Sequence, residues 1–232
     1  MNKKIALITG TSSGIGLELA KKLLNNDYFV IGVCRKPETI KNGDFMPVQC
    51  DLSMPENTIK CFKKIKQELT QLDVLVNNAG AGRFGPHETI NPMDIAYMVN
   101  LNLNAPMIIT SILLPLLRKA KGHIINVSSI TAKKPSPQGS AYGATKAGLL
   151  HFSASLFEEV RKNGVKVTAV CPDITKSAFF NKLNFGPYDK EGAYLNAEFI
   201  AEQILQIINQ ANQGVITEMV IRPQILSLNY KK

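Results

Sequence analysis

The chain has 232 residues, of which 45% are hydrophobic and 19% charged, and it carries a formal net charge of +9. This composition is typical of one soluble globular domain, and no apolar run approaches the roughly 20 residues that a membrane-spanning helix needs. The N-terminus begins with basic residues, but the apolar run behind them ends after four residues, at Thr9-Gly10. That run is too short for a signal peptide, so we expect a cytoplasmic protein with no membrane partner.

The positive charge raises the hypothesis of nucleic-acid binding. Most of the basic side chains are lysines, however, and they are dispersed along the chain. Several of them share the polar side of one predicted helix: Lys60, Lys63, Lys64 and Lys66. A solvated helix face explains this group, and no aromatic side chains interleave with it. We therefore expect no nucleic-acid partner, and an anionic cofactor or substrate is a simpler reason for part of the charge.

The cysteines and histidines show no spacing typical of a metal site. They are Cys34, Cys50, Cys61 and Cys171, and His87, His123 and His151. Most of the cysteines lie in or beside strand-like runs, which favours buried free thiols over disulfides. The sequence predicts no metal.

Apolar runs alternate with helical patterns along the chain. The runs typical of strands are Ile5–Thr9, Phe29–Cys34, Phe45–Cys50, Val74–Asn77, His123–Val127, Lys166–Cys171 and Val215–Ile221. The helical patterns are Gly14–Asn26, Glu56–Thr70, Asp94–Ala120, Tyr142–Asn163 and Ala197–Gln210. Because the first strands are continuously apolar, we expect a parallel sheet that is covered on both faces. The pattern predicts one α/β domain over residues 1–232, a Rossmann-type, doubly wound parallel sheet of about seven strands with helices on both faces.

The turn after the first strand is rich in glycine. It reads Thr9-Gly10-Thr11-Ser12-Ser13-Gly14-Ile15-Gly16, and a helical pattern begins within it. Glycines there allow the backbone to approach a pyrophosphate, and the helix N-terminus supplies N–H groups. This predicts a dinucleotide site to which Gly10, Thr11, Ser12, Ser13, Gly14, Ile15 and Gly16 contribute.

The end of the second strand indicates which dinucleotide is bound. Folds that prefer NAD place an acid there for the ribose 2′-hydroxyl, but this chain has Arg35 instead. Because Arg35 is placed to meet a 2′-phosphate, we predict NADP(H). After the third strand, Asp51 and Leu52 are expected at the adenine, although Asp51-Leu52 could equally form a helix-capping turn.

Tyr142 and Lys146 are four residues apart on a predicted helix and therefore share one face. A lysine cation about 5 Å from the phenol would favour the phenolate by roughly 3 kcal/mol, or about two pKa units. The spacing predicts that Lys146 lowers the pKa of Tyr142 toward the range of proton exchange near neutral pH.

Four motifs together resemble the short-chain dehydrogenase/reductase family in order and spacing. They are the T-G-x-x-x-G-x-G turn at Thr9–Gly16, Asn77-Asn78-Ala79-Gly80, Ser129, and Tyr142-x-x-x-Lys146. The resemblance covers nearly the whole chain. It implies that Asn78, Ala79 and Gly80 lie near the cofactor ribose, that Ser129 holds the substrate carbonyl, and that Tyr142 is the acid/base. It also implies that Lys146 binds the nicotinamide ribose.

The family also uses an asparagine carbonyl in a proton relay through a water to the lysine. Asn100, Asn102 and Asn104 are candidates. Because Pro106 has no N–H, the carbonyl of Asn102 loses its helical partner and needs another donor. We choose Asn102, with Asn100 as the alternative. Ser128, next to Ser129, is expected to be supporting.

The sixth predicted strand is followed by Pro172-Asp173-Ile174-Thr175. In the family Pro172 and Ile174 would back the nicotinamide and Thr175 would contact its carboxamide, but Asp173 stands where a glycine is usual. This substitution places a carboxylate near the substrate. Residues 175–196, approximately, read as a substrate lid. Its aromatic residues indicate either an apolar part of the substrate or a cap on the core.

We read the protein as an NADP(H)-dependent reductase of a ketone or aldehyde, reversibly an alcohol dehydrogenase. A 3-oxoacyl-[acyl-carrier-protein] reductase is an alternative, because lysines could attract that acidic carrier. A non-catalytic protein that senses NADP(H) is the alternative from another class. The helix around Ile108–Leu117 is apolar nearly all round, and family members pair it across a two-fold axis, so we expect a homodimer or homotetramer.

Overall fold

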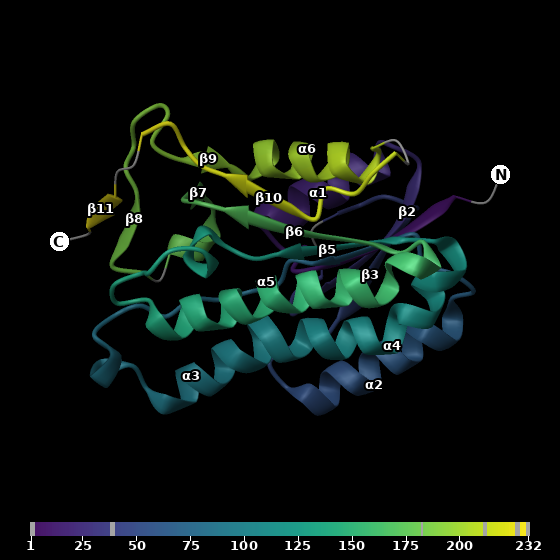
Figure 1. Ribbon diagram of the computed structural model, residues 1–232, viewed down its shortest axis with the longest axis horizontal. Helices are drawn as coiled ribbons and strands as arrows, with labels where there is room; N and C mark the ends of the chain where they lie inside the picture. Colours follow the sequence, from purple (N-terminus) through teal and green to yellow (C-terminus); the bar gives the residue numbers. More distant parts are fainter. Residues whose placement is uncertain (1–2, 38–39, 182, 211–212, 226–227, 231–232) are drawn as a thin grey trace.

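The computed structural model describes residues 3–37, 40–181, 183–210, 213–225 and 228–230. Seven parallel strands form its main sheet, in the order β10-β6-β5-β4-β1-β2-β3 (Figure 1). Their bounds are β1 (Lys4–Thr9), β2 (Tyr28–Cys34), β3 (Phe45–Gln49), β4 (Val74–Asn77), β5 (His123–Val127), β6 (Lys166–Pro172) and β10 (Glu218–Ile221). This confirms the predicted doubly wound parallel sheet.

Helices cover both faces of the sheet (Figure 1). One face carries α1 (Gly14–Leu24) and α6 (Ala197–Ile208), and the other carries α2 (Pro55–Glu68), α4 (Ala105–Ala120) and α5 (Ser140–Val160). On β1, Ala6 and Ile8 join the core under α1 and α6, whereas Leu7 joins the core under α2, α4 and α5. Successive side chains on a strand point to opposite faces, so a strand buried on both faces must be apolar throughout.

The strand order reverses between β1 and β4. The chain runs outward from β1 to β2 and β3, then returns to β4 on the other side of β1. The carboxyl ends of β1 and β4 therefore lie next to each other, and their connecting loops diverge to opposite faces. Doubly wound folds bind ligands in the crevice at such a point.

The helix predicted over Asp94–Ala120 is interrupted in the structure. It consists of α3 (Pro92–Val99), one π-helical turn (Asn100–Asn104) and α4. The whole stretch Pro92–Ala120 has the length and composition of a membrane span, alone among the described helices. In the fold, however, Ile109, Leu113 and Leu117 of α4 are buried in the core. Packing against the sheet explains the apolar residues on one side of α4, whereas only 39% of the apolar window is buried inside the protein.

The last strand of the main sheet, β10, is shorter than predicted. Only Glu218–Ile221 pairs with β6, whereas the preceding residues contact β6 through single bonds, such as Thr168 Oγ1 to the Ile216 carbonyl. The short helical turns are 3₁₀ segments at His87–Thr89, Ile130–Ala132, Arg161–Asn163 and Ala178–Phe180.

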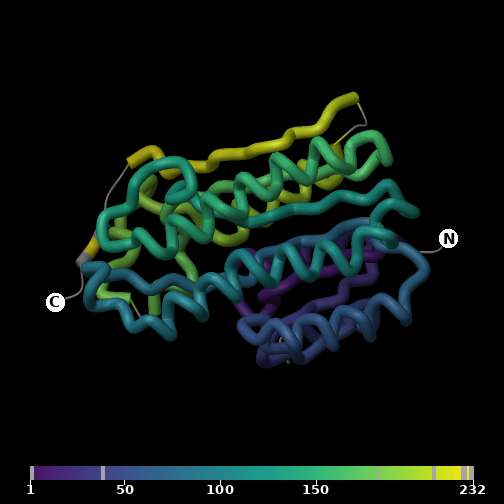
Figure 2. The backbone as a smooth tube through the Cα atoms, turned by 60° about the horizontal axis from the view of Figure 1, so that its bottom comes forward, coloured from purple at the N-terminus to yellow at the C-terminus, as the bar shows by residue number. Residues whose placement is uncertain are grey.

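The segment after β6 forms two small sheets at one end of the molecule, on the left in Figures 1 and 2. In one, β7 (Thr175–Lys176) pairs with β9 (Leu195–Asn196); in the other, β8 (Phe185–Pro187) pairs with β11 (Leu228–Tyr230). Most of the predicted lid lies in this segment.

Candidate active site

A cavity of about 830 Å³ opens at the carboxyl ends of the parallel strands. It extends from Arg35 and Asp51, after β2 and β3, to Tyr142 and Lys146 on α5. Of the residues predicted to bind a cofactor, those that line it are Gly10, Ser12, Ser13, Gly14, Ile15, Arg35, Asp51, Leu52, Asn78, Ala79, Gly80, Tyr142, Lys146, Pro172, Ile174 and Thr175. Thr11 and Gly16 do not line the cavity. They lie beneath the turn, where Thr11 is fully buried.

The glycine-rich turn has the shape that its sequence requires. Gly10 and Gly14 adopt φ angles of +77° and +60°, which favour glycine. A Cβ on Gly16 would lie 2.4 Å from the Gly10 carbonyl oxygen, so Gly16 lets α1 approach the turn closely. The N-cap Ser13 makes no side-chain capping bond. The first N–H groups of α1 thus remain available at the cavity wall, an arrangement suited to a pyrophosphate.

Asn78 fixes the loop after β4 to the glycine-rich turn. Its Nδ2 donates to the Thr9 carbonyl at 2.9 Å, and Thr9 Oγ1 accepts from the Asn78 and Ala79 N–H groups at 3.0 Å each. These bonds hold together the two loops that diverge where the strand order reverses.

The far end of the cavity carries one cation and one carboxylate. Arg35 is exposed there. Partial burial acts to raise the pKa of Asp51, but hydrogen bonds from Ser53 and the charge of Arg35 lower that pKa overall. Asp51 Oδ1 accepts from the Ser53 N–H at 3.0 Å and the Ser53 hydroxyl at 2.7 Å, just before α2. Asp51 therefore forms the turn that the sequence offered as an alternative, and it also lines the cavity, while its contact with the adenine stays a prediction.

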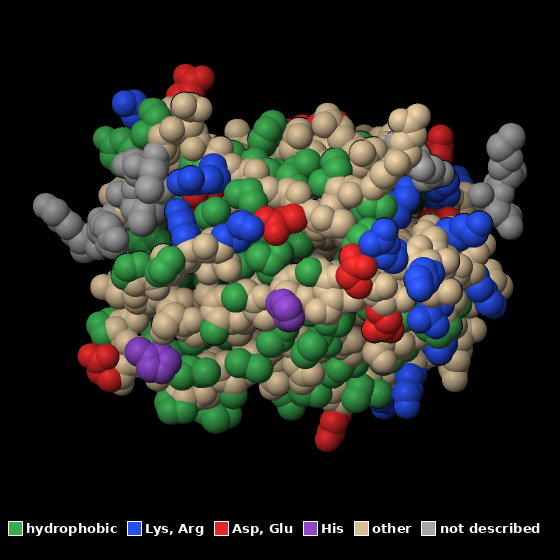
Figure 3. Space-filling model, in the orientation of Figure 1, with side chains coloured by type: hydrophobic (Ala, Val, Ile, Leu, Met, Phe, Trp, Pro, Cys, Tyr) green, Lys and Arg blue, Asp and Glu red, His purple; other side chains and the backbone are tan. Residues whose placement is uncertain are grey.

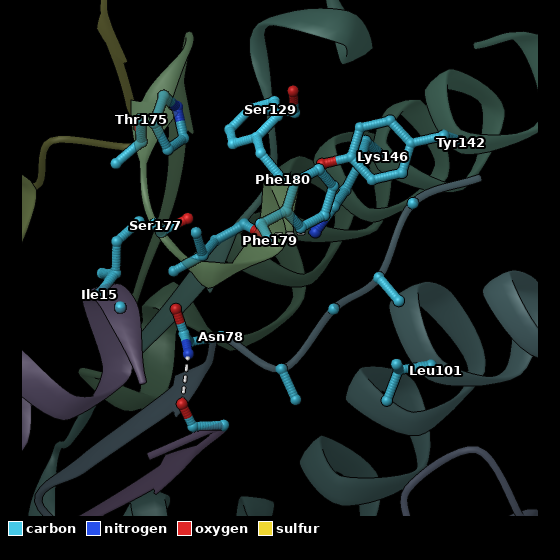
Figure 4. A pocket seen from close by; sticks show the side chains of 18 of the residues that line it. Ile15, Asn78, Leu101, Ser129, Tyr142, Lys146, Thr175, Ser177, Phe179 and Phe180 are labelled. Atoms are coloured by element: carbon cyan, nitrogen blue, oxygen red, sulfur yellow. Dashed lines mark hydrogen bonds between the residues drawn. The ribbon is translucent and has the colours of Figure 1, made fainter. Parts of the chain in front are cut away.

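Ser129, Tyr142 and Lys146 meet at the other end. Figure 4 shows them together with Phe179 and Phe180, away from Ile15 and Asn78. Ser129 follows β5, and its hydroxyl lies near enough to Tyr142 to act on the pKa of the phenol. Lys146 lies one turn along α5 from Tyr142, and its Nζ donates to the Val127 carbonyl at 2.9 Å. Ser128 donates to the Lys146 carbonyl at 2.8 Å, which fits a supporting contact.

The predicted effect of Lys146 on the Tyr142 pKa is wrong for the protein alone. Burial raises the pKa of Tyr142 to about 12, and only the nearby Ser129 hydroxyl acts to lower it. Burial also lowers the pKa of Lys146 to about 8. The Lys146 amine lies 5.9 Å from the Tyr142 ring centroid and is directed to Val127. Desolvation of the two groups therefore outweighs their mutual attraction.

The structure distinguishes Asn102 from its neighbours on the π turn. Asn102 is fully buried, and its side chain exchanges two hydrogen bonds with Ala81, accepting from the N–H at 2.9 Å and donating to the carbonyl at 2.8 Å. It also donates to Thr145 Oγ1 at 3.1 Å. The Asn104 side chain instead donates to Asn100 Oδ1, at 3.5 Å. Asn102 thus joins the loop after β4 to α5, while its part in a proton relay stays a prediction.

The carboxylate of Asp173 lines the cavity but is bound within the protein. Its side chain is 4% exposed. Oδ1 accepts from the Ile174 N–H at 2.9 Å, and Oδ2 lies 3.3 Å from Arg222 Nε and 3.6 Å from Lys134 Nζ. The residue that departs from the family pattern therefore connects three segments at the cavity wall. Its carboxylate is not open to a substrate.

Sequence reasoning missed Phe84 and Lys134, which also line the cavity. Phe84 lies between Gly82 and Gly85 in a loop without helical or strand periodicity. The signal that could have revealed it is the pair of flanking glycines, because a Cβ on Gly82 would lie 2.5 Å from the Phe84 ring. Phe179, Phe180 and Phe185 of the predicted lid line the same cavity.

Comparison with known proteins agrees with this geometry. The family model for short chain dehydrogenases matches residues 4–186. Carbonyl reductase family member 4 of Xenopus laevis is 32% identical over 215 residues, which cover 88% of this chain and 91% of that protein. A probable NADP-dependent dehydrogenase of Haemophilus influenzae is 30% identical over 238 residues, with coverage of 96% and 94%.

A solved structure is similar over almost the same length. The crystal structure of a metagenomic short-chain oxidoreductase in complex with NADP matches with a TM-score of 0.80 and 31% identity, covering 96% of this chain and 98% of that one. The strand order, the glycine-rich turn and the family match lead to one conclusion. The chain belongs to the short-chain dehydrogenase/reductase family of oxidoreductases.

Proposed function

We propose that this protein is an NADP(H)-dependent oxidoreductase that reversibly converts a ketone or aldehyde to an alcohol. The observation that carries the proposal is the convergence of Ser129, Tyr142 and Lys146 at one end of a cavity whose other end carries Arg35. A bound dinucleotide would connect the two ends, with its reactive ring beside the Ser129 and Tyr142 hydroxyls.

NADP(H) is the cofactor that these residues fit. The uncapped N-terminus of α1 suits the pyrophosphate, and Arg35 suits a 2′-phosphate. Two of the similar proteins point the same way by their names, the NADP-dependent dehydrogenase and the oxidoreductase in complex with NADP. Pro172, Ile174 and Thr175 would hold the nicotinamide end. When bound, the cofactor supplies or accepts the hydride.

The remaining chemistry belongs to this chain. The Ser129 hydroxyl holds and polarises the carbonyl oxygen of the substrate, and Tyr142 donates the proton that this oxygen takes up. A pKa of about 12 keeps Tyr142 protonated at neutral pH, ready to donate in the direction of reduction. Lys146 binds the ribose hydroxyls, and the carbonyl of Asn102 holds a water that reconnects the pair to solvent.

Two other functions have weaker support. Reduction of a 3-oxoacyl group on acyl carrier protein would use the same residues, and exposed lysines such as Lys60 and Lys63 would attract the acidic carrier. A protein that only senses NADP(H) would not need Ser129, Tyr142 and Lys146 to meet. We further propose a cytoplasmic location, because all four cysteines are free thiols, as expected in a reducing compartment.

The Tyr142→Phe variant tests the mechanism. It keeps the aromatic ring and its packing but removes the proton donor, so we expect turnover of every carbonyl substrate to fall by about 1,000-fold or more, in line with the loss of an essential acid. NADPH oxidation followed by absorbance measures turnover, and fluorescence titration measures NADPH binding, which should stay within about twofold. Normal turnover in this variant would exclude Tyr142 as the acid.

A further inference from the structure

Four phenylalanine rings form a closed circuit beside Tyr142, which we call the aromatic wall (Phe84, Phe179, Phe180 and Phe185). Around the circuit, the ring centroids are 5.0 Å apart for Phe84–Phe185, 5.8 Å for Phe185–Phe180, 5.2 Å for Phe180–Phe179 and 6.4 Å for Phe179–Phe84. Every pair meets edge to face, at interplanar angles of 73–85°. This is the geometry in which aromatic rings attract one another.

The aromatic wall adjoins the reacting group. The Tyr142 ring lies 5.2 Å from Phe84 and 5.8 Å from Phe179. A carbonyl held by the Tyr142 and Ser129 hydroxyls would therefore extend its substituent along these rings. All four rings line the cavity and are only partly buried by the protein, so each keeps apolar surface that an apolar group could cover.

Glycines on two separate loops make room for the aromatic wall. A Cβ on Gly82 would lie 2.5 Å from the Phe84 ring and 2.7 Å from the Phe179 ring. A Cβ on Gly139, from the loop before α5, would lie 2.9 Å from the other edge of Phe84. The Phe84 ring thus fits between two glycines, Gly82 and Gly139, that contribute no side chain, and the fold fixes its position.

The charged groups near the aromatic wall are engaged within the protein. Among the described residues that line this end of the cavity, Arg83 pairs with Asp94 at 3.1 Å and stacks on Tyr97, and Lys134 pairs with Asp173 at 3.6 Å. The Lys146 amine donates to the Val127 carbonyl. Lys134 shares the Asp173 carboxylate with Arg222, however, and the Arg83 and Lys134 side chains are each more than a third exposed, so these pairs do not exclude an anionic substrate.

We infer that the substrate is a carbonyl compound that carries an aromatic ring close to the reacting carbon. The inference rests on the proposed carbonyl reductase function and names its substrate class. The aromatic wall holds this ring by edge and face contacts.

Two matched methyl ketones test the inference. In 1-phenyl-2-propanone and 1-cyclohexyl-2-propanone, a methylene separates the ring from the carbonyl, so their intrinsic reactivities are similar. Because an aromatic contact is worth more than its buried area alone, we expect kcat/KM with NADPH to be about three- to tenfold higher for the phenyl ketone.

Variants of the wall connect this preference to its residues. Phe84→Leu and Phe185→Leu keep apolar volume but remove a ring, so each should move the phenyl-to-cyclohexyl ratio toward one. Phe199→Leu, on the exposed side of α6, is the matched control and should keep the wild-type ratio. Two wall variants from different loops guard against a folding defect in one of them, which thermal melting detects.

The outcomes separate the inference from the function on which it rests. If the enzyme reduces 2-butanone and both ring ketones but shows no phenyl preference, the proposed function stands and the inference is wrong. A phenyl preference that survives in both Phe84→Leu and Phe185→Leu also overturns it. If NADPH binds but no ketone or aldehyde is reduced, both the function and the inference fail.

Discussion

Lys146 is a buried cation whose burial has a thermodynamic cost. Its side chain is 4% exposed, and burial lowers its pKa to about 8 from an ordinary value of 10.5. Below pH 8 the folded protein keeps an ammonium group that the unfolded chain would solvate better. A shift of this size corresponds to about 3 kcal/mol, and the bond to the Val127 carbonyl offsets about 1 kcal/mol. The group that the mechanism needs therefore destabilises the fold near neutral pH.

The Lys146→Met variant should consequently be more stable than the wild type, by about 2 kcal/mol at pH 7. A depressed folded-state pKa means that the unfolded chain binds more protons between pH 8 and 10.5. Wild-type stability from this group therefore rises with pH over that window, and the gap should nearly close at about pH 9.5. Urea unfolding at the two pH values measures both quantities. Lys60→Met, at an exposed position on α2, is the control and should show no such gap; a variant less stable at pH 7 would contradict the prediction.

Spacing in the sequence predicted which residues meet at the site, but it could not predict how deeply they are buried. The four-residue interval of Tyr142 and Lys146 fixes their shared helix face whatever surrounds the helix. Their pKa values depend on Phe84 and Phe179, which pack around Tyr142 from loops far away in the sequence. Desolvation is thus a tertiary property, and for this reason the predicted direction of the Tyr142 pKa was wrong.

At the scale of elements, the π turn between α3 and α4 positions Asn102. In this turn the Ala105 N–H bonds to the Asn100 carbonyl, five residues back, and Pro106 follows with no N–H to give. The wider turn changes the angular register of the helix, and it lies beside the loop after β4. Pro106 allowed the sequence to predict a freed carbonyl near Asn102. No residue in the sequence marks the extra residue of the π turn, because the turn depends on tertiary contacts such as the side-chain bonds of Asn102 to Ala81.

Asn102→Ala removes the three hydrogen bonds that join the loop after β4 to α5. It leaves the Ala81 N–H and carbonyl without these partners, so we expect the free energy of unfolding to fall by about 2–4 kcal/mol. Chemical denaturation measures the change. Asn104→Ala on the same turn loses one bond of 3.5 Å and should cost less than about 1 kcal/mol. Equal stability of the two variants would show that Asn102 does not hold this junction.

At the scale of the molecule, charged side chains are unevenly distributed over the surface. In the view of Figure 3, lysines and arginines gather toward the right-hand end and the upper left. The central region over α4 and α5 carries mainly hydrophobic and uncharged side chains. On α5 the exposed positions include Ala144, Ala147 and Ala154, small residues that permit another helix to approach closely. On α4, Ile112 and Leu114 are only partly buried. The sequence predicted that this helix is apolar, but the sequence of one chain does not identify which partner covers its outer surface.

We predict that a second copy of the chain covers the surface of α4 and α5. Light scattering should then give a mass of about 51 kDa for a dimer, twice the 25.5 kDa of the chain, or a multiple of it.

Ala147→Glu keeps good helix propensity but places a charge at the centre of this surface, so we expect it to shift the mass toward 25.5 kDa. Phe199→Glu on α6 is the control and should leave the mass unchanged, because this residue is 47% exposed and α6 covers the opposite face of the sheet from α5. A wild-type protein that stays at the monomer mass at every concentration would exclude the dimer. The apolar outer surface of α4 and α5 would then be exposed in solution, and Ala147→Glu would alter neither mass nor stability.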